Sequence, residues 1–314
     1  MTSEVTGGPG TRAPSVRGDA PPSVARRAAR VAVRTVGVAT ALLRPLPDFL
    51  IIGAKRSGTT SLFRYIDSHP CVLAQFPSAK HMPFMAMNTK GVHWFDRSPE
   101  RGRWWYRSHF PTAATRTLAS RRAGAPVATG EGSPYYFIHP EAPVRAAAEL
   151  PHARLIVVVR NPVDRAYSHW AEQRRDAREP LDFVEALDAE AARLEGEEER
   201  LGRREIRASV HYEHHSYVRQ GEYARFLERW YRGFPKEQLL VLLSEDLYRD
   251  PQSTLDRVFR FLGLEPHRLT DPQPWNAAPR SPMAEGTRRR LEEHFRPWNE
   301  QFVELTGVQP SWGA

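Results

Sequence analysis

The chain has 314 residues, of which 40% are hydrophobic and 26% are charged, values that are ordinary for a globular protein. Eight tryptophans and fourteen phenylalanines exclude a largely disordered chain. No run approaches the roughly 18 apolar residues that a membrane span needs, so no transmembrane segment is expected. The single cysteine, Cys71, excludes an internal disulfide and a thiolate-rich metal cluster, and it favours a reducing cytoplasm.

The formal net charge of +8 raises the question of nucleic-acid binding, but its distribution weakens that interpretation. Residues 1–47 carry a net charge of +5, which leaves only +3 for the rest of the chain. Residues 1–25 are rich in Gly, Pro, Ser and Thr, and residues 26–44 mix Arg with Val and Ala. We expect residues 1–47 to form a disordered basic tail, with a tail or amphipathic helix favoured over an export signal. The tail could make weak contact with a membrane surface.

The pattern after Pro47 alternates between short apolar runs and helical spacing. Residues 49–53 form an apolar run bounded by glycine, typical of a buried parallel strand, and helical spacing follows until Pro70. This alternation predicts an α/β fold, a P-loop-like doubly wound parallel sheet flanked by helices, as a single domain over residues 48–314. Further strands are predicted at residues 127–130, 155–159 and 239–243, and helices after residue 162, over 181–205 and at 223–234, 255–262 and 291–302.

The turn after the first strand has the composition of an anion site. It reads Gly53-Ala-Lys-Arg-Ser-Gly-Thr-Thr60, between a strand and the start of a helix. Free backbone N–H groups and the helix dipole both favour an anion there. The glycine spacing matches a nucleoside-triphosphate loop, but Thr59 stands where that motif needs lysine. The cations Lys55 and Arg56 precede Gly58 instead, and Thr59 and Thr60 add hydroxyl donors.

A second polar element follows the clearest strand. Arg160 lies at its carboxyl end, where open α/β sheets bind ligands, and Ser168 lies about two turns into the next helix. Both side chains can therefore converge on one phosphate. Alone this element is a weak signal, because an arginine often caps a strand end, but paired with the first loop it is strong.

This pair of elements resembles sulfotransferases. The stretch from Ile51 to Leu62 looks like their 5′-phosphosulfate loop, and the stretch from Arg160 to Ser168 looks like their 3′-phosphate motif. Further stretches resemble the heparan sulfate sulfotransferase branch and its bacterial relatives, in the family's order over residues 48–312. They are Gly91-Val-His-Trp-Phe-Asp96, Trp104-Trp-Tyr-Arg-Ser-His-Phe-Pro111, Gly130-Glu-Gly-Ser-Pro-Tyr-Tyr-Phe137, Glu245-Asp-Leu-Tyr-Arg-Asp-Pro251 and Phe261-Leu-Gly-Leu264.

The resemblance implies an EC 2.8.2 enzyme that moves a sulfonate from 3′-phosphoadenosine 5′-phosphosulfate to a hydroxyl or amine, without a metal. Carbohydrates, glycolipids and secondary metabolites are the candidate acceptors. Arg56 would contact the phosphosulfate directly with Lys55 assisting, and Arg160 and Ser168 would hold the 3′-phosphate. Trp275 and Arg280 resemble a loop that closes over the nucleotide, as adenine stack and phosphate ligand. The remaining loop contacts would come from Ser57, Gly58, Thr59, Thr60 and Ser61.

Two departures from the family pattern concern the chemistry. Gly91 stands where the family's general base, a glutamate, is usual, and Gly132 replaces a lysine of the family's Glu-Lys-x-Pro stretch. The base must therefore be sought elsewhere. His93 is the first choice, because histidines ordinarily titrate near neutral pH and Asp96 could orient it. Glu131 is the second choice and His81 the third.

Three other functions stay open at this point. A P-loop kinase is disfavoured by Thr59, and by the lack of a clear Mg²⁺-binding carboxylate after a strand. A catalytically impaired nucleotide-binding module is kept open by the departures at Gly91 and Gly132. A protein that binds nucleic acid through residues 12–44 is the third alternative. His211, His214 and His215 resemble a metal site by count only.

Overall fold

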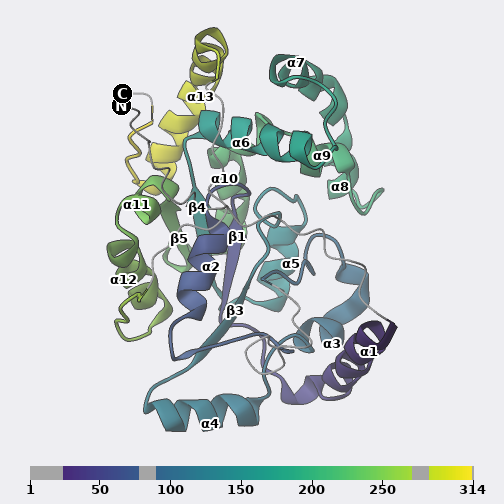
Figure 1. Ribbon diagram of the computed structural model, residues 1–314, viewed down its shortest axis with the longest axis vertical. Coiled ribbons are helices and arrows are strands. Elements are labelled where there is room, and N and C mark those ends of the chain that lie inside the picture. Colours follow the sequence, from purple (N-terminus) through teal and green to yellow (C-terminus); the bar gives the residue numbers. More distant parts are fainter. Residues whose placement is uncertain (1–23, 78–89, 271–282, 313–314) are drawn as a thin grey trace, which may run out of the picture.

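The computed structural model describes residues 24–77, 90–270 and 283–312 (Figure 1). Its centre is one sheet of five parallel strands in the order β2-β3-β1-β4-β5. The four strands that the sequence predicted are confirmed, and a two-residue edge strand, too short to leave a periodic pattern, adds to them. The strands are β1 (Phe49–Gly53), β2 (Val72–Leu73), β3 (Ala128–Gly132), β4 (Arg154–Val159) and β5 (Leu239–Leu243).

Helices cover both faces of the sheet, as a doubly wound arrangement requires. The nine central residues Phe49–Gly53 and 156–159 are all buried, which is why these strands read as continuous apolar runs rather than as alternating patterns. The α-helices are α1 (Val24–Ala39), α2 (Thr59–Asp67), α3 (Gly102–Arg107), α4 (Ala113–Ala123), α5 (Ala142–Glu149), α6 (Pro162–Arg175), α7 (Phe183–Leu194), α8 (Glu197–Gly202), α9 (Val210–His214), α10 (Tyr223–Gly233), α11 (Ser244–Arg249), α12 (Pro251–Leu262) and α13 (Glu285–Thr306). Short 3-10 helices lie at Ala41–Leu43, Pro99–Arg101, Arg219–Gly221 and Lys236–Gln238.

Two apolar cores lie on opposite faces of the sheet. Leu50 and Val157 point into the core that α5 and α10 close, whereas Ile51 and Val158 point into the core that α2 and α12 close. Each core follows from the alternation of side chains along a strand, which sends successive residues to opposite faces. In the first core, Trp230 is fully buried and its indole N–H donates to the carbonyl of Phe137.

The connections that follow β1 and β3 leave the sheet on opposite faces, which makes the carboxyl ends of these two strands the expected place for a ligand crevice. β1 leads into α2 on one face of the sheet, and β3 leads toward α5 on the other face. Open α/β sheets bind ligands where neighbouring connections leave in opposite directions in this way. α6 and α7 gather at this end of the molecule, while α1, α3 and α4 lie at the opposite end (Figure 1).

The N-terminal segment departs from the expected disordered tail. Residues 24–39 form α1, which packs on α3, and Arg34 donates a hydrogen bond to the hydroxyl of Ser108 at 3.0 Å. The close approach of α1 depends on the missing side chain at Gly37. A Cβ atom there would lie only 3.0 Å from the Ser108 carbonyl oxygen. Residues 24–39 thus form a helix, the alternative that the sequence offered at residues 26–44, and not a disordered tail. The domain boundary near residue 47 stays a prediction. None of the described helices is both long and apolar enough to cross a bilayer.

The contact between β1 and β3 allows a test of the sheet's centre. Gly130 pairs with Phe49, and a methyl group at Gly130 would lie 2.5 Å from the buried Phe49 ring. We expect Gly130→Ala to lower the free energy of unfolding by about 1–3 kcal/mol, because overpacking must shift the ring or the strand. Urea unfolding followed by circular dichroism measures this change. Gly286→Ala in α13, where no atom lies within 4 Å, is the matched control and should cause no loss. Equal stability of both variants would contradict the tight packing at Gly130.

Candidate active site

The loop between β1 and α2 presents the start of a helix to the crevice. Gly58 caps α2 with a φ of 91°, a conformation that glycine adopts without strain. Arg56 also has a positive φ, of 70°. α2 begins at Thr59, so the free N–H groups of its first turn face an anion placed at the loop. Ser57, Thr59 and Ser61 are buried, and Thr60 is partly exposed.

The two loop cations lie against α6. The Arg56 Nε donates to Ser168 Oγ at 3.0 Å, and its terminal nitrogen donates to Glu172 Oε1 at 2.7 Å. Lys55 Nζ lies 3.5 Å from the other carboxylate oxygen of Glu172. Burial lowers the pKa of Lys55 to about 8, and the charge of Glu172 opposes that shift. The structure thus joins the first loop to the α6 element through Arg56 and Ser168.

Sequence reasoning missed Glu172. A signal for it existed, since Glu172 follows Ser168 by four residues and so lies on the same face of α6. A carboxylate on that face is the natural counter-ion for a cation that reaches Ser168.

Arg160 follows β4, and a hydrogen bond to its backbone carbonyl holds it in place. The Tyr223 hydroxyl donates to the Arg160 carbonyl at 2.8 Å, and the Arg160 guanidinium lies 4.0 Å from Asp164 in the first turn of α6. Fully buried Arg165 donates to the carbonyl of Tyr217. Burial lowers the pKa of Arg165, and the charges of the Arg56 and Arg160 side chains lower it further. The beginning of α6 therefore carries two arginines, Arg160 and Arg165, together with the carboxylate of Asp164.

A third cation, Lys90, reaches the start of α2 from the other side of the crevice. Its Nζ donates to Thr59 Oγ1 at 2.7 Å and to Thr60 Oγ1 at 3.3 Å. Burial lowers the pKa of Lys90 to about 7. The lysine side chain passes over Gly132, where an added methyl group would lie 2.9 Å from Lys90 Cε. Sequence reasoning did not place Lys90 in the site, although it is one of only four lysines in the chain.

The segment 90–93 runs along the end of β3 and is fixed to it by backbone hydrogen bonds. The Gly132 N–H donates to the Lys90 carbonyl at 2.7 Å, and the His93 N–H donates to Ser133 Oγ at 3.0 Å. Gly91 is pressed against this strand, because a methyl group there would lie 2.7 Å from Ser133 Oγ. The close approach explains why position 91 carries no side chain.

Glu131, the second candidate base, is fully buried and accepts four hydrogen bonds. The hydroxyls of Tyr106 and Tyr136 donate to Oε1 at 3.0 and 2.9 Å. The Val92 N–H and the Ser133 hydroxyl donate to Oε2 at 2.7 and 2.6 Å. Burial raises the pKa of the Glu131 carboxyl, and these donors oppose the shift. With both oxygens occupied, this arrangement favours a positioning role over proton abstraction.

His93, the first candidate base, is oriented as the sequence suggested. Its Nδ1 lies 2.7 Å from Oδ2 of Asp96, which is buried. Because an ionised carboxylate can only accept, Nδ1 carries the proton in this contact, and in the neutral imidazole the lone pair is then on Nε2. The His93 side chain is 30% exposed, so this lone pair can meet a substrate. His81, Trp275 and Arg280 lie outside the described residues.

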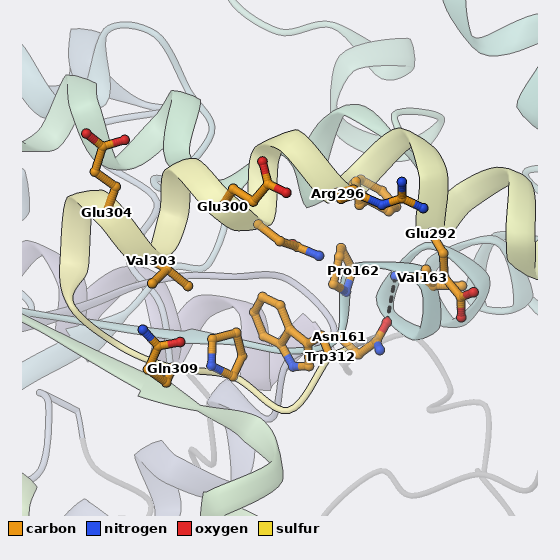
Figure 2. A pocket seen from close by; sticks show the side chains of 13 residues that line it. Asn161, Pro162, Val163, Glu292, Arg296, Glu300, Val303, Glu304, Gln309 and Trp312 are labelled. Carbon is orange, nitrogen blue, oxygen red and sulfur yellow. Dashed lines mark hydrogen bonds between the residues drawn. The ribbon is translucent and has the colours of Figure 1, made fainter. Parts of the chain in front are cut away.

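A separate cavity of about 600 Å³ lies between the start of α6, α13 and the C-terminal segment (Figure 2). Asn161 is among the lining residues, and its Oδ1 accepts the Val163 N–H at 3.0 Å. The charged lining comprises Glu292, Glu300, Glu304 and Arg296, which is acidic on balance. Such a lining suits a nucleotide bisphosphate less well than the cationic crevice at β1.

The histidine cluster has partners of its own. His211 and His215 share a hydrogen bond of 3.0 Å between their Nδ1 atoms, and His215 Nε2 lies 3.1 Å from the Arg178 carbonyl oxygen. Within residues 24–77, 90–270 and 283–312, no group of three or more His, Cys, Asp or Glu side chains could hold a metal ion.

Comparison with known proteins identifies the family. Residues 46–273 match the family described as "Sulfotransferase domain". Human heparan sulfate glucosamine 3-O-sulfotransferase 6 is 34% identical over 297 residues, covering 86% of this chain and 75% of that protein. Human bifunctional heparan sulfate N-deacetylase/N-sulfotransferase 3 is 34% identical over 227 residues, covering 71% of this chain but only 23% of that protein.

Among solved structures, a sulfotransferase from Alicyclobacillus acidocaldarius is similar, with a TM-score of 0.59 and 25% identity. The likeness covers 85% of this chain and 98% of that one. Together with the crevice and its cations, these matches show that the chain belongs to the sulfotransferase family and is a transferase of sulfonate groups.

Proposed function

We propose that the chain transfers the sulfonate of 3′-phosphoadenosine 5′-phosphosulfate to a hydroxyl or amine of an acceptor. The observation that carries this proposal is the Arg56–Ser168 hydrogen bond, which unites the loop at α2 and the start of α6 into one cationic site. A donor with phosphates at both ends of its ribose needs two anion sites at such a junction. The N–H groups of the first turn of α2 fit its 5′ end, and Arg160 and Ser168 fit its 3′-phosphate.

The donor supplies an activated sulfonate, and the chain's residues supply position, charge and a base. The acceptor oxygen attacks sulfur as the bond between sulfur and the 5′-phosphate oxygen breaks, and the bonding electrons stay on that phosphate. Arg56, with Lys55 assisting, offsets the charge that develops there. His93 Nε2 takes the acceptor proton, and Asp96 holds the imidazole in the required tautomer.

The contacts of Glu172 indicate how the loop cations become available. Arg56 and Lys55 both face this carboxylate, so an anion at the loop competes with Glu172 for the same donors. The arginine fork can keep its bond to Ser168 while its terminal nitrogens change partner.

A carbohydrate is the acceptor class that the relatives favour, with a glycolipid or a secondary metabolite as alternatives. Both human relatives are named for heparan sulfate, a carbohydrate. A bacterial cytoplasm is the compartment we infer, because the lone cysteine suits a reducing environment. Nucleic acid is not a proposed partner. Membrane-surface contact by the N-terminal segment would be weak.

The donor assignment predicts a ligand preference. Adenosine 3′,5′-bisphosphate should raise the melting temperature more than AMP or ATP, because only it offers a 3′-phosphate to Arg160 and Ser168. Arg160→Ala should weaken bisphosphate binding by about 1.5–3 kcal/mol, the scale of a charged hydrogen bond. Calorimetric titration measures the affinity, and Arg121→Ala on exposed α4 is the control. Equal stabilisation by AMP would contradict the assignment of Arg160 to the 3′-phosphate. If no nucleotide stabilised the protein, the proposed donor itself would be contradicted.

The loop cations should differ in their effect on turnover. Arg56→Ala should lower kcat and kcat/KM together by about 10²- to 10³-fold, because the lost charge acts mainly on the leaving phosphate. Lys55→Ala should have a smaller effect. Transfer of ³⁵S from labelled donor to heparan oligosaccharides, glycolipid extracts and phenolic metabolites measures the rates and tests the acceptor class. A larger loss for Lys55→Ala would reverse the two assignments.

Substitutions of His93 and Glu131 should damage different properties, turnover for His93 and folding stability for Glu131. His93→Ala should reduce kcat by about 10²- to 10⁴-fold, the usual contribution of a general base, with bisphosphate affinity unchanged. Glu131→Gln should instead lower the free energy of unfolding by about 1–3 kcal/mol, because the new amide opposes the buried donors. Steady-state kinetics and urea unfolding supply the two readouts. Near-normal kcat in a folded His93→Ala protein would exclude His93 as the base.

A further inference from the structure

The mechanism above leaves the partly buried amine of Lys90 unused. Both loop cations face the carboxylate of Glu172, whereas the amine of Lys90 contacts two neutral hydroxyls, Thr59 and Thr60. Over the described part of the chain, no carboxylate forms an ion pair with Lys90. A partly buried ammonium without a counter-ion is costly, and an anionic group of the ligand beside it would relieve that cost.

Hydrogen bonds to the backbone of Lys90 fix the point from which its side chain extends. The Lys90 carbonyl accepts the Gly132 N–H at 2.7 Å and the Gln75 side-chain amide at 3.1 Å, which fixes the residue at the end of β3. The path of the side chain crosses Gly132, where even a methyl group would approach Lys90 Cε to 2.9 Å. Position 132 must therefore stay without a side chain for Lys90 to reach Thr59.

The direction of approach decides which part of the donor Lys90 meets. Lys55 and Arg56 lie on the α6 side of the loop, beside the expected leaving phosphate. Lys90 lies on the β3 side and belongs to the same fixed segment as His93, the candidate base. In an in-line displacement, sulfur lies between the leaving oxygen and the attacking oxygen. The amine of Lys90 thus flanks the path between the leaving phosphate and the base.

We propose that Lys90 is a catalytic residue whose ammonium donates hydrogen bonds to the oxygens of the transferred sulfonate, and that Gly132 is the residue that makes room for it. The inference rests on the proposed sulfonate transfer and adds a residue to it. No proton leaves Lys90 in this role. Sulfur changes its bond from the 5′-phosphate oxygen to the acceptor oxygen, and the ammonium offsets charge on the sulfonate during that exchange.

Substitution of Lys90 should damage catalysis without damaging nucleotide binding. Lys90→Ala should lower kcat/KM by about 10²-fold, the usual loss for one donor to a transition-state oxyanion. Its affinity for adenosine 3′,5′-bisphosphate, which lacks the sulfonate, should stay unchanged. Wild-type kcat/KM in Lys90→Ala would overturn the proposal. An equal loss of bisphosphate affinity would also overturn it, by moving the contact to the phosphate.

Exchanging the two side chains tests the role of Gly132. Gly132→Lys alone should be defective, because its side chain collides with Lys90. The double variant Lys90→Ala/Gly132→Lys removes the collision and returns an amine to the crevice, so it should recover a substantial part of the activity that Lys90→Ala loses. A folded double variant no more active than Lys90→Ala would overturn the pairing of these positions. Circular dichroism and bisphosphate binding verify folding of each variant.

Lysine footprinting gives a readout that does not depend on turnover. The chain has four lysines, so acetylation by limiting acetic anhydride at neutral pH can be followed at each by mass spectrometry. The donor should protect both Lys55 and Lys90, whereas the bisphosphate should protect Lys55 more than Lys90. Exposed Lys236 serves as the internal reference. Protection of Lys55 alone by the donor would overturn the role of Lys90 and leave the proposed function intact. Protection of neither lysine would overturn both.

Discussion

The buried carboxylate of Glu131 is the interaction on which the geometry of the crevice depends. It lies at the end of a central strand and gathers two tyrosine hydroxyls, a serine hydroxyl and the Val92 N–H around its two oxygens. A carboxylate taken out of water is costly unless such donors surround it, so the network is stable only when every donor is present. In satisfying that need, the protein fixes the segment that bears Lys90 and His93 against β3.

The fold was largely readable from the sequence because parallel strands buried on both faces leave continuous apolar runs. β1, β4 and β5 follow from that rule. β3 reads Ala-Thr-Gly-Glu-Gly, which is not an apolar run although all five residues are buried. The two-residue β2 was not readable, since its pairing with β3 depends on neighbours distant in the chain. For α1 the sequence offered an amphipathic helix only as an alternative to a tail, and the packing of this helix on α3 depends on residues distant in the chain.

The site was readable only in part, and the reason differs between residues. Arg56 and Ser168 were proposed from the sequence because each belongs to a local motif with a physical meaning, and the structure joins them by a hydrogen bond. Lys90 was missed because its side chain reaches Thr59 only by passing over Gly132, a contact that no local pattern records. Residue type suggested Glu131 as a base, but type does not reveal how many donors surround a carboxylate. His93 and Asp96 are three residues apart, so their contact could be anticipated.

The ion pairs of Glu172 have a kinetic meaning under the proposed chemistry. Substrate nucleotide and product nucleotide carry the same 5′-phosphate, and each must displace this carboxylate from Arg56 and Lys55. Such an internal competitor weakens both complexes alike, and binding energy shared equally by ground states does not speed the chemical step. Under this chemistry, Glu172 is a counter-ion within the site that speeds dissociation of the product nucleotide at the cost of weaker nucleotide binding.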